Sequence, residues 1–179
     1  ANINCTDVFG IVGNNFTFPT QIYHKVTNIV WTKNKHKVAE WEGQNKPTYF
    51  KPLENRSVLM ENGSLTIFNL TKNDAGSYAL WFMDSEGDVH LTFELVVYDS
   101  LTEPKIICNA SDGKLVINCT ADFPGPLDCI LKFGDKQQSC QNPLSIPVED
   151  VGTTSSAKCI VKSSQMERSS EIFLHQCLP

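Results

Sequence analysis

The chain has 179 residues, a formal net charge of -5, 41% hydrophobic residues and 20% charged residues. This length fits one large domain or two domains of about 90 residues each, and the composition is that of a folded globular protein. The acidic balance excludes a nucleic-acid partner, because a phosphate backbone requires a basic surface. No apolar run is long enough to span a bilayer, so we expect membrane attachment only through an anchor that this chain lacks.

An excess of glycan acceptor triplets indicates the compartment. Seven Asn-x-Ser/Thr triplets begin at Asn4, Asn15, Asn55, Asn62, Asn69, Asn109 and Asn118. This composition would give roughly two by chance, and such a triplet accepts a glycan only on a secreted chain. The sequence therefore predicts a glycoprotein on the extracellular face of the plasma membrane.

Short alternating runs broken by turn residues predict an all-β chain. In the first half, the expected strands cover residues 11–18, 28–33, 38–42, 58–60, 64–69, 77–83 and 90–98. Seven strands in this length are enough for a sandwich of two sheets. The polar segment 99–104 ends in Pro104 and is expected to be a linker. We therefore predict one domain over residues 1–98 and a second over residues 105–179.

A short motif indicates the fold of the first domain. The segment Asp74-Ala75-Gly76-Ser77-Tyr78 has the D-x-G-x-Y pattern of the tyrosine corner in immunoglobulin-type sandwiches. Trp31 stands 47 residues before Tyr78, where the buried tryptophan of strand C is expected. Two residues after Tyr78, Leu80 replaces the usual cysteine, and Phe16 or Phe18 would replace its partner. Apolar packing would then offset the loss of a bridge that contributes about 2–4 kcal/mol.

The remaining cysteines are expected to form a disulfide framework in the second domain. Six cysteines allow fifteen pairings, and the sequence alone does not choose among them. We prefer a nested pattern with the bridges Cys108–Cys177, Cys119–Cys159 and Cys129–Cys140. Zinc is disfavoured, because zinc sites use closely spaced pairs and the shortest gap here contains nine residues. Cys5 has no identifiable partner, and we expect it to be buried near the first strand.

Several segments resemble one group of known proteins. Residues 35–42, 63–71 and 99–101, together with the six-cysteine tail, resemble the lymphocyte adhesion and signalling receptors of the immunoglobulin superfamily. The resemblance is strongest to the ligands of the T-lymphocyte erythrocyte-rosette receptor. It implies a variable-type domain followed by a disulfide-rich constant-2-type domain, and an immunoglobulin-superfamily receptor on T or natural killer lymphocytes as partner. The alternatives are a glycan-anchored B-lymphocyte relative, a self-associating signalling receptor of the group, or a pathogen-encoded mimic.

Strand alternation predicts a binding face on the first domain. If Trp31 and Leu80 point inward, Trp81 points outward, and an outward tryptophan is typical of interfaces. A register error of one residue would instead bury it. If Ala39 and Trp41 point inward, Glu40 and Glu42 share the outer face, which contains no glycan acceptor. The predicted receptor-binding residues are Lys33, Lys35, Lys37, Glu40, Glu42 and Trp81, with Lys46, Phe50, Asp84, Glu86 and Asp88 at the rim.

The sequence favours a binding module over an enzyme. Its four histidines, His24, His36, His90 and His175, lie in no catalytic motif, and no G-x-S-x-G pattern is present. We therefore expect no catalysis, cofactor, metal or small-molecule substrate. A purely structural spacer would explain the second domain but not Trp81 and the charged face. The predicted function is that of a cell-surface ligand that promotes cell–cell adhesion and costimulation.

Overall fold

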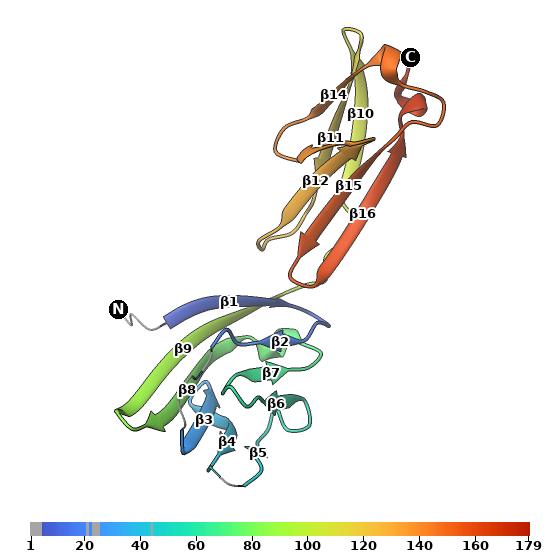
Figure 1. The fold of residues 1–179 in the computed structure, drawn as a ribbon. Coiled ribbons are helices and arrows are strands. Elements are labelled where there is room, and N and C mark those ends of the chain that lie inside the picture. The colour runs from blue at the N-terminus through green and yellow to red at the C-terminus, as the bar shows by residue number, and fades with distance from the viewer. Residues whose placement is uncertain (1–4, 21, 23–25, 44) are drawn as a thin grey trace. The chain divides into compact units, whose positions relative to one another are not determined.

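The computed structural model describes residues 5–20, 22, 26–43 and 45–179. The chain divides into two compact units, Ala1–Ser100 and Leu101–Pro179 (Figure 1). Both units are sandwiches of two β-sheets. Within the described residues, every helix is a short 3-10 turn, and none has the length and apolar character needed to cross a membrane.

The first unit combines a sheet of six strands with a sheet of three. The larger sheet has the order β1 (Cys5–Ile11), β9 (Gly87–Tyr98), β8 (Gly76–Asp84), β3 (Asn28–Lys33), β4 (His36–Trp41) and β5 (Thr48–Tyr49). The smaller sheet has the order β2 (Phe16–Thr17), β7 (Leu65–Ile67) and β6 (Ser57–Leu59). Among the described strands of this unit, β1 and β9 are the only two that pair in parallel. The strands β4 and β5 at the edge of the larger sheet are typical of a variable-type domain.

Aromatic packing replaces the inter-sheet disulfide of the first unit. Phe18, Trp31 and Leu80 are all fully buried. The ring centroids of Phe18 and Trp31 lie 4.9 Å apart, and the Trp31 indole N–H donates to the carbonyl oxygen of Gly63 at 3.0 Å. Phe18 is thus the counterpart of Leu80, whereas Phe16 is half-buried and packs edge-on against Phe18. The prediction of a sandwich core without a disulfide is confirmed.

The tyrosine corner forms just before β8. After the short helix η1 (Lys72–Asp74), the Tyr78 hydroxyl donates to the carbonyl oxygen of Asp74 at 2.6 Å. The Asp74 carboxylate accepts two hydrogen bonds from the Arg56 guanidinium, at 3.0 and 2.7 Å. Burial by itself would raise the pKa of Asp74, but Arg56 and the Thr71 backbone N–H hold it below its usual value of 3.8. The Arg56–Asp74 ion pair therefore joins the two sheets at this corner. The Asp74 side chain is only 2% exposed.

The first unit differs from the sequence predictions in three respects. The expected strand over residues 11–18 is interrupted, because β1 ends at Ile11 and a turn with a left-handed Gly13 precedes β2. The strands β1 and β5 were not predicted, since both are edge strands whose pairing is non-local or short. The expected burial of Cys5 is also wrong: this free cysteine is exposed, because it lies opposite Thr92 on the outer face of β9.

The second unit also has two sheets. One contains β10 (Lys105–Ser111), β11 (Lys114–Thr120) and β14 (Leu144–Pro147), and the other contains β13 (Lys136–Ser139), β12 (Asp128–Phe133), β15 (Ser156–Ser163) and β16 (Met166–Phe173). The short helices η2 (Val148–Asp150) and η3 (Leu174–Cys177) follow β14 and β16. Buried Leu115, Ile117, Leu131 and Leu174 belong to its core. Leu101, within the segment predicted as a linker, also packs into this core.

Three disulfides connect the second unit: Cys108–Cys177, Cys119–Cys159 and Cys129–Cys140. The first joins β10 to η3, and the second joins β11 to β15 across the two sheets. The third joins β12 to the residue immediately after β13. This arrangement is the disulfide-rich constant-2-type domain expected after a variable-type domain.

Candidate functional site: the outer face of the large sheet

The strand β8 sets the two faces of the six-stranded sheet. Tyr78, Leu80 and Phe82 are buried against the core, with exposed fractions of 1%, 0% and 7%. Because side chains alternate along a strand, Ala79, Trp81 and Met83 lie on the opposite face. Trp81 is half-buried there, and Met83 is 39% exposed. The register that would have buried Trp81 does not occur.

Four strands align a row of side chains around Trp81. Trp81 lies opposite Val30 on β3 and opposite His90 on β9, and Val30 in turn lies opposite Glu40 on β4. Directly opposed side chains in antiparallel strands are near neighbours. The tryptophan therefore lies between Val30 and the His90 imidazole, and one strand, β3, separates it from Glu40 on β4.

A second row of small side chains forms a hollow beside the first. Thr32, Ala79 and Thr92 lie opposite one another on β3, β8 and β9. They line a hollow of about 630 Å³ together with Cys5, Asn34, Lys35, Ser77, Tyr78 and Glu94. Because Ala79 and Trp81 are two residues apart on one strand face, the hollow is adjacent to the tryptophan. This surface therefore combines a half-buried aromatic ring with a neighbouring recess.

A β-bulge in β4 directs Lys37 to the same face. Trp31 lies opposite Ala39 but Thr32 lies opposite Lys37, so Val38 is an extra residue without a partner on β3. Both Val38 and Ala39 are fully buried, whereas Lys37 is exposed beside Thr32. Such an extra residue breaks the strict alternation of side chains, so residues before the bulge follow the opposite in–out pattern to residues after it. Strict alternation from Glu40 would have turned Lys37 inward.

The bulge also pairs two charges on the face. The Nζ of Lys37 lies 2.9 Å from Oε2 of Glu40. This hydrogen bond and charge, with a smaller effect from Glu42, raise the pKa of Lys37 above its usual value of 10.5. The lysine therefore remains fully charged throughout the physiological range. Exposed ion pairs contribute little to stability, and the Lys37 side chain is 53% exposed, so this pair is not needed for the fold.

The structure brings together most of the predicted binding residues but not Lys33. Lys33 lies opposite Tyr78, whose side chain points to the core, and its Nζ donates to the carbonyl oxygen of Asn73 before β8. It therefore points away from the face that contains Trp81. The cause is strand alternation, since Lys33 follows the outward Thr32.

The other predicted residues lie on or around the face. Lys35 occupies the β3–β4 turn with a left-handed backbone, and Glu42 is exposed directly after β4. At one edge, Lys46 is exposed and Phe50 is half-buried near β5. At the other edge, Asp84, Glu86 and Asp88 lie in the β8–β9 hairpin, where the Glu86 backbone N–H donates to Asp84 at 2.8 Å.

Three further residues belong to the face, although they were not among the predicted binding residues. Val30 and His90 lie directly opposite Trp81, and Met83 is two residues beyond it. The alternation that placed Trp81 outward also places Met83 and His90 outward. Val30 could have been found in the same way, as the residue before the inward Trp31.

The described glycan acceptors of the first unit lie away from this face. Asn15 precedes β2, Asn55 precedes β6, Asn62 follows β6 and Asn69 follows β7, so all four flank the three-stranded sheet. Each is exposed, and Oδ1 of Asn15 accepts a hydrogen bond from the backbone N–H of Asn69 at 3.0 Å. Asn4 lies outside the described residues. In the second unit, Asn109 on β10 and Asn118 on β11 are acceptors too.

The described residues contain one group of side chains close enough to share a metal ion. It consists of Cys119, Cys129, Cys140 and Cys159, and all four are bonded in disulfides. A metal is bound by thiolate sulfur, and a disulfide sulfur does not provide this ligand. The group is therefore not a metal site in the oxidised protein.

Comparisons with known proteins identify relatives. The chain is 33% identical over 114 residues to human lymphocyte function-associated antigen 3, covering 63% of this chain and 44% of that protein. The chain is an immunoglobulin-fold protein similar to this antigen. The resemblance expected from the sequence is thus confirmed. It is also 30% identical over 116 residues to human T-lymphocyte surface antigen Ly-9, covering 56% of this chain and 16% of that protein.

Solved structures support the fold, while family models do not match the chain. The CD2-binding domain of CD58, which is lymphocyte function-associated antigen 3, superimposes with a TM-score of 0.58 and 24% identity, covering 94% of this chain and 96% of that one. Murine CEACAM1b superimposes with a TM-score of 0.52 and 17% identity, covering 92% and 94%. At these identities the structures establish the fold alone. The chain spans less than half the length of the two curated relatives, and neither is named as an enzyme.

Proposed function

We propose that this protein is an extracellular adhesion ligand that binds an immunoglobulin-superfamily receptor on lymphocytes. The binding site is the outer face of β3, β4, β8 and β9 in the first unit. The observation that carries this proposal is the row of Glu40, Val30, Trp81 and His90 on a sheet face. A half-buried tryptophan beside an apolar residue, surrounded by charges, is the composition of a binding hot spot with a polar rim.

The charges of the face suit contact between two cells. Lys35 and Lys37 lie near the β3–β4 turn, and the acidic side chains of the β8–β9 hairpin lie at the opposite end of those strands. A partner must present the reverse pattern, so like charges reject the wrong receptors. Complementary charges increase the association rate more than the affinity. Such contacts form quickly and dissociate quickly.

The relatives suggest the receptor. The structure of CD58 is described as a CD2-binding domain, and this chain is 33% identical to the same antigen in human. We therefore propose a receptor of the CD2 type as partner, and a location on the extracellular face of the plasma membrane. The match to Ly-9 makes another receptor of the lymphocyte group the alternative.

An engineered glycan tests the face directly. The substitution Val30→Thr creates an acceptor triplet that begins at Asn28, on the outer face of β3 opposite Met83. In glycosylating cells, we expect this variant to fold and to lose binding to the ectodomains of lymphocyte receptors, including CD2. Val30→Ala, which creates no triplet, is the matched control and should retain most of the binding.

The possible outcomes test the binding face and the identity of the receptor separately. If the glycosylated Val30→Thr variant binds like the parent, the proposed face is wrong. If the parent binds another receptor of the panel and the glycan blocks it, the face is right and the CD2-type partner is wrong. Removal of the glycan from the variant by an endoglycosidase should restore part of the binding, which a misfolded variant would not show.

A further inference from the structure

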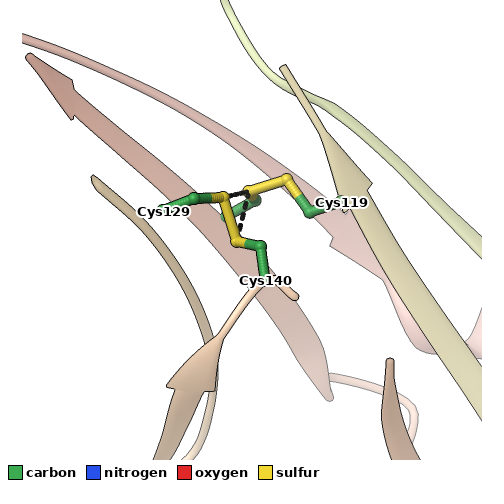
Figure 2. Close-up of side chains that lie close together, drawn as sticks. Cys119, Cys129 and Cys140 are labelled. Carbon is green, nitrogen blue, oxygen red and sulfur yellow. Dashed lines mark hydrogen bonds between the residues drawn. A yellow bond between two sulfur atoms is a disulfide. The ribbon is translucent and has the colours of Figure 1, made fainter. Parts of the chain in front are cut away.

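Two disulfides of the second unit lie in contact. The sulfur atoms of Cys119, Cys129, Cys140 and Cys159 all lie within 4.8 Å of one another. The Sγ of Cys159 is 3.5 Å from that of Cys129 and 3.8 Å from that of Cys140, although it is bonded to Cys119. Figure 2 shows the side chains of Cys119 on β11, Cys129 on β12 and Cys140 just after β13 pointing toward one another. A thiolate formed in one bridge would therefore already touch a sulfur of the other.

The two bridges differ in access to solvent. Cys159 is fully buried and Cys119 is 7% exposed, whereas Cys129 and Cys140 are half-buried. A surface hollow of about 220 Å³ is lined by Cys119, Cys129 and Cys140, together with Ala121, Leu127, Ser139 and Gln141. Cys159 does not line it. A small thiol that enters this hollow therefore meets both cysteines of the Cys129–Cys140 bridge but only Cys119 of the other bridge.

We propose that the Cys129–Cys140 disulfide is a reduction site for dithiols and that it passes the exchange on to the Cys119–Cys159 disulfide. In the first step, a thiolate of the dithiol attacks one sulfur of Cys129–Cys140, and its second thiol resolves the mixed disulfide. The dithiol is oxidised to a cyclic disulfide. Cys129 and Cys140 each gain one electron and one proton.

The second step needs no further electrons. The Cys129 thiolate attacks Sγ of Cys159, so a Cys129–Cys159 bond forms and the Cys119–Cys159 bond breaks. The electron pair leaves on Cys119, which takes up the proton that Cys129 released. A disulfide bond is about 2.05 Å long, so the two sulfurs must approach by roughly 1.5 Å. Attack by Cys140 gives the equivalent product Cys140–Cys159.

The exchange changes what the buried bridge connects. Cys119–Cys159 joins β11 in one sheet to β15 in the other, whereas Cys129–Cys159 joins the neighbouring strands β12 and β15. The internal exchange therefore removes the disulfide that joins a strand of one sheet directly to a strand of the other. After reduction of one accessible bridge, Cys108–Cys177 would be the remaining disulfide between β10 and the segment that follows β16.

Limited reduction of the intact chain tests this proposal. The chain is treated briefly with dithiothreitol, the free thiols are trapped with an alkylating reagent at low pH, and linked peptides are mapped. Among molecules with two trapped thiols, we expect peptides with Cys129–Cys159 or Cys140–Cys159 bonds and an alkylated Cys119. If all such molecules retain Cys119–Cys159 and carry the label on Cys129 and Cys140, the internal exchange is refuted.

Paired variants give a second, kinetic test. In Cys129→Ser/Cys140→Ser, we expect dithiothreitol to reduce Cys119–Cys159 more slowly than in the parent, by on the order of tenfold, because the internal thiolate is absent. Cys108→Ser/Cys177→Ser is the matched control, since it removes a bridge outside the cluster and should leave this rate unchanged. Equal rates in the first variant and the parent would overturn the proposal, and the peptide map of the parent does not depend on either variant folding.

Discussion

The side chain of Trp81 on β8 lies directly opposite His90 on β9, on the outer face of the six-stranded sheet. This pair combines a half-buried indole with an exposed imidazole at the centre of the face. An aromatic anchor beside an imidazole suits a partner that presents both an apolar recess and a hydrogen-bonding group. Receptor binding should therefore depend on this face, and the position of the face should depend on the core that supports it.

Truncation of the tryptophan should weaken receptor binding. For Trp81→Ala we expect a loss of about 2 kcal/mol, or roughly thirtyfold in affinity, because a central aromatic side chain carries a large share of an interface's energy. Surface binding to the receptor measures this loss. Phe68→Ala removes a 41% exposed aromatic residue near the small sheet and serves as control. Equal losses in both variants would show that Trp81 has no special role.

Charge reversal should act mainly on association. In Lys37→Glu, the contact with Glu40 is replaced by repulsion, and the complementary charge of the receptor loses its partner. We expect a slower association rate, a smaller dependence of that rate on salt, and little change in thermal stability. Lys72→Glu reverses an exposed charge that pairs with Asp99 off the face. If the two variants associate at the same rate across a salt series, Lys37 does not contribute to the site.

The charged pair below the tyrosine corner should make stability depend on pH. For Asp74→Asn we expect a loss of about 2 kcal/mol in unfolding free energy near neutral pH, because the Arg56 guanidinium loses its buried charged acceptor. The folded pKa of Asp74 lies below 3.8, so the parent loses this contribution as the pH falls from that value through the folded pKa.

Acid titration of the parent and of Asp74→Asn tests the direction of this pH dependence. The difference in unfolding free energy between the parent and Asp74→Asn should be constant above about pH 5 and should shrink below it. Asp99→Asn changes an 87% exposed carboxylate and should leave the curve unchanged. A difference that grows at acidic pH would contradict the proposed role of the Arg56 pair.

The core that replaces the missing disulfide should be sensitive to truncation. Leu80→Ala leaves a cavity beside buried neighbours and should destabilise the first unit by about 2–5 kcal/mol, measured by denaturant unfolding. Val96→Ala changes a 45% exposed side chain and should cost less than about 0.5 kcal/mol. A small effect at Leu80 would mean that the two sheets do not depend on this packing.

Several features of the fold and the site could be predicted from local sequence. The D-x-G-x-Y motif predicted the hydrogen bond of Tyr78, and the positions of Trp31 and Leu80 predicted a core without a disulfide. Alternation predicted the outward position of Trp81. These inferences succeeded because each depends on residues close in the chain or on the period of two that every strand imposes.

Tertiary pairing decided what local patterns could not. The outward Lys37 depends on a bulge at Val38, and the exposed Cys5 depends on the parallel pairing of β1 with β9. The spacing of the cysteines disfavoured zinc, yet it gave no sign that Cys129 would touch Cys159. The sequence determined how side chains alternate along each strand. Contacts between strands distant in the chain determined which side chains lie together, because register and sheet packing are set only when the strands pair.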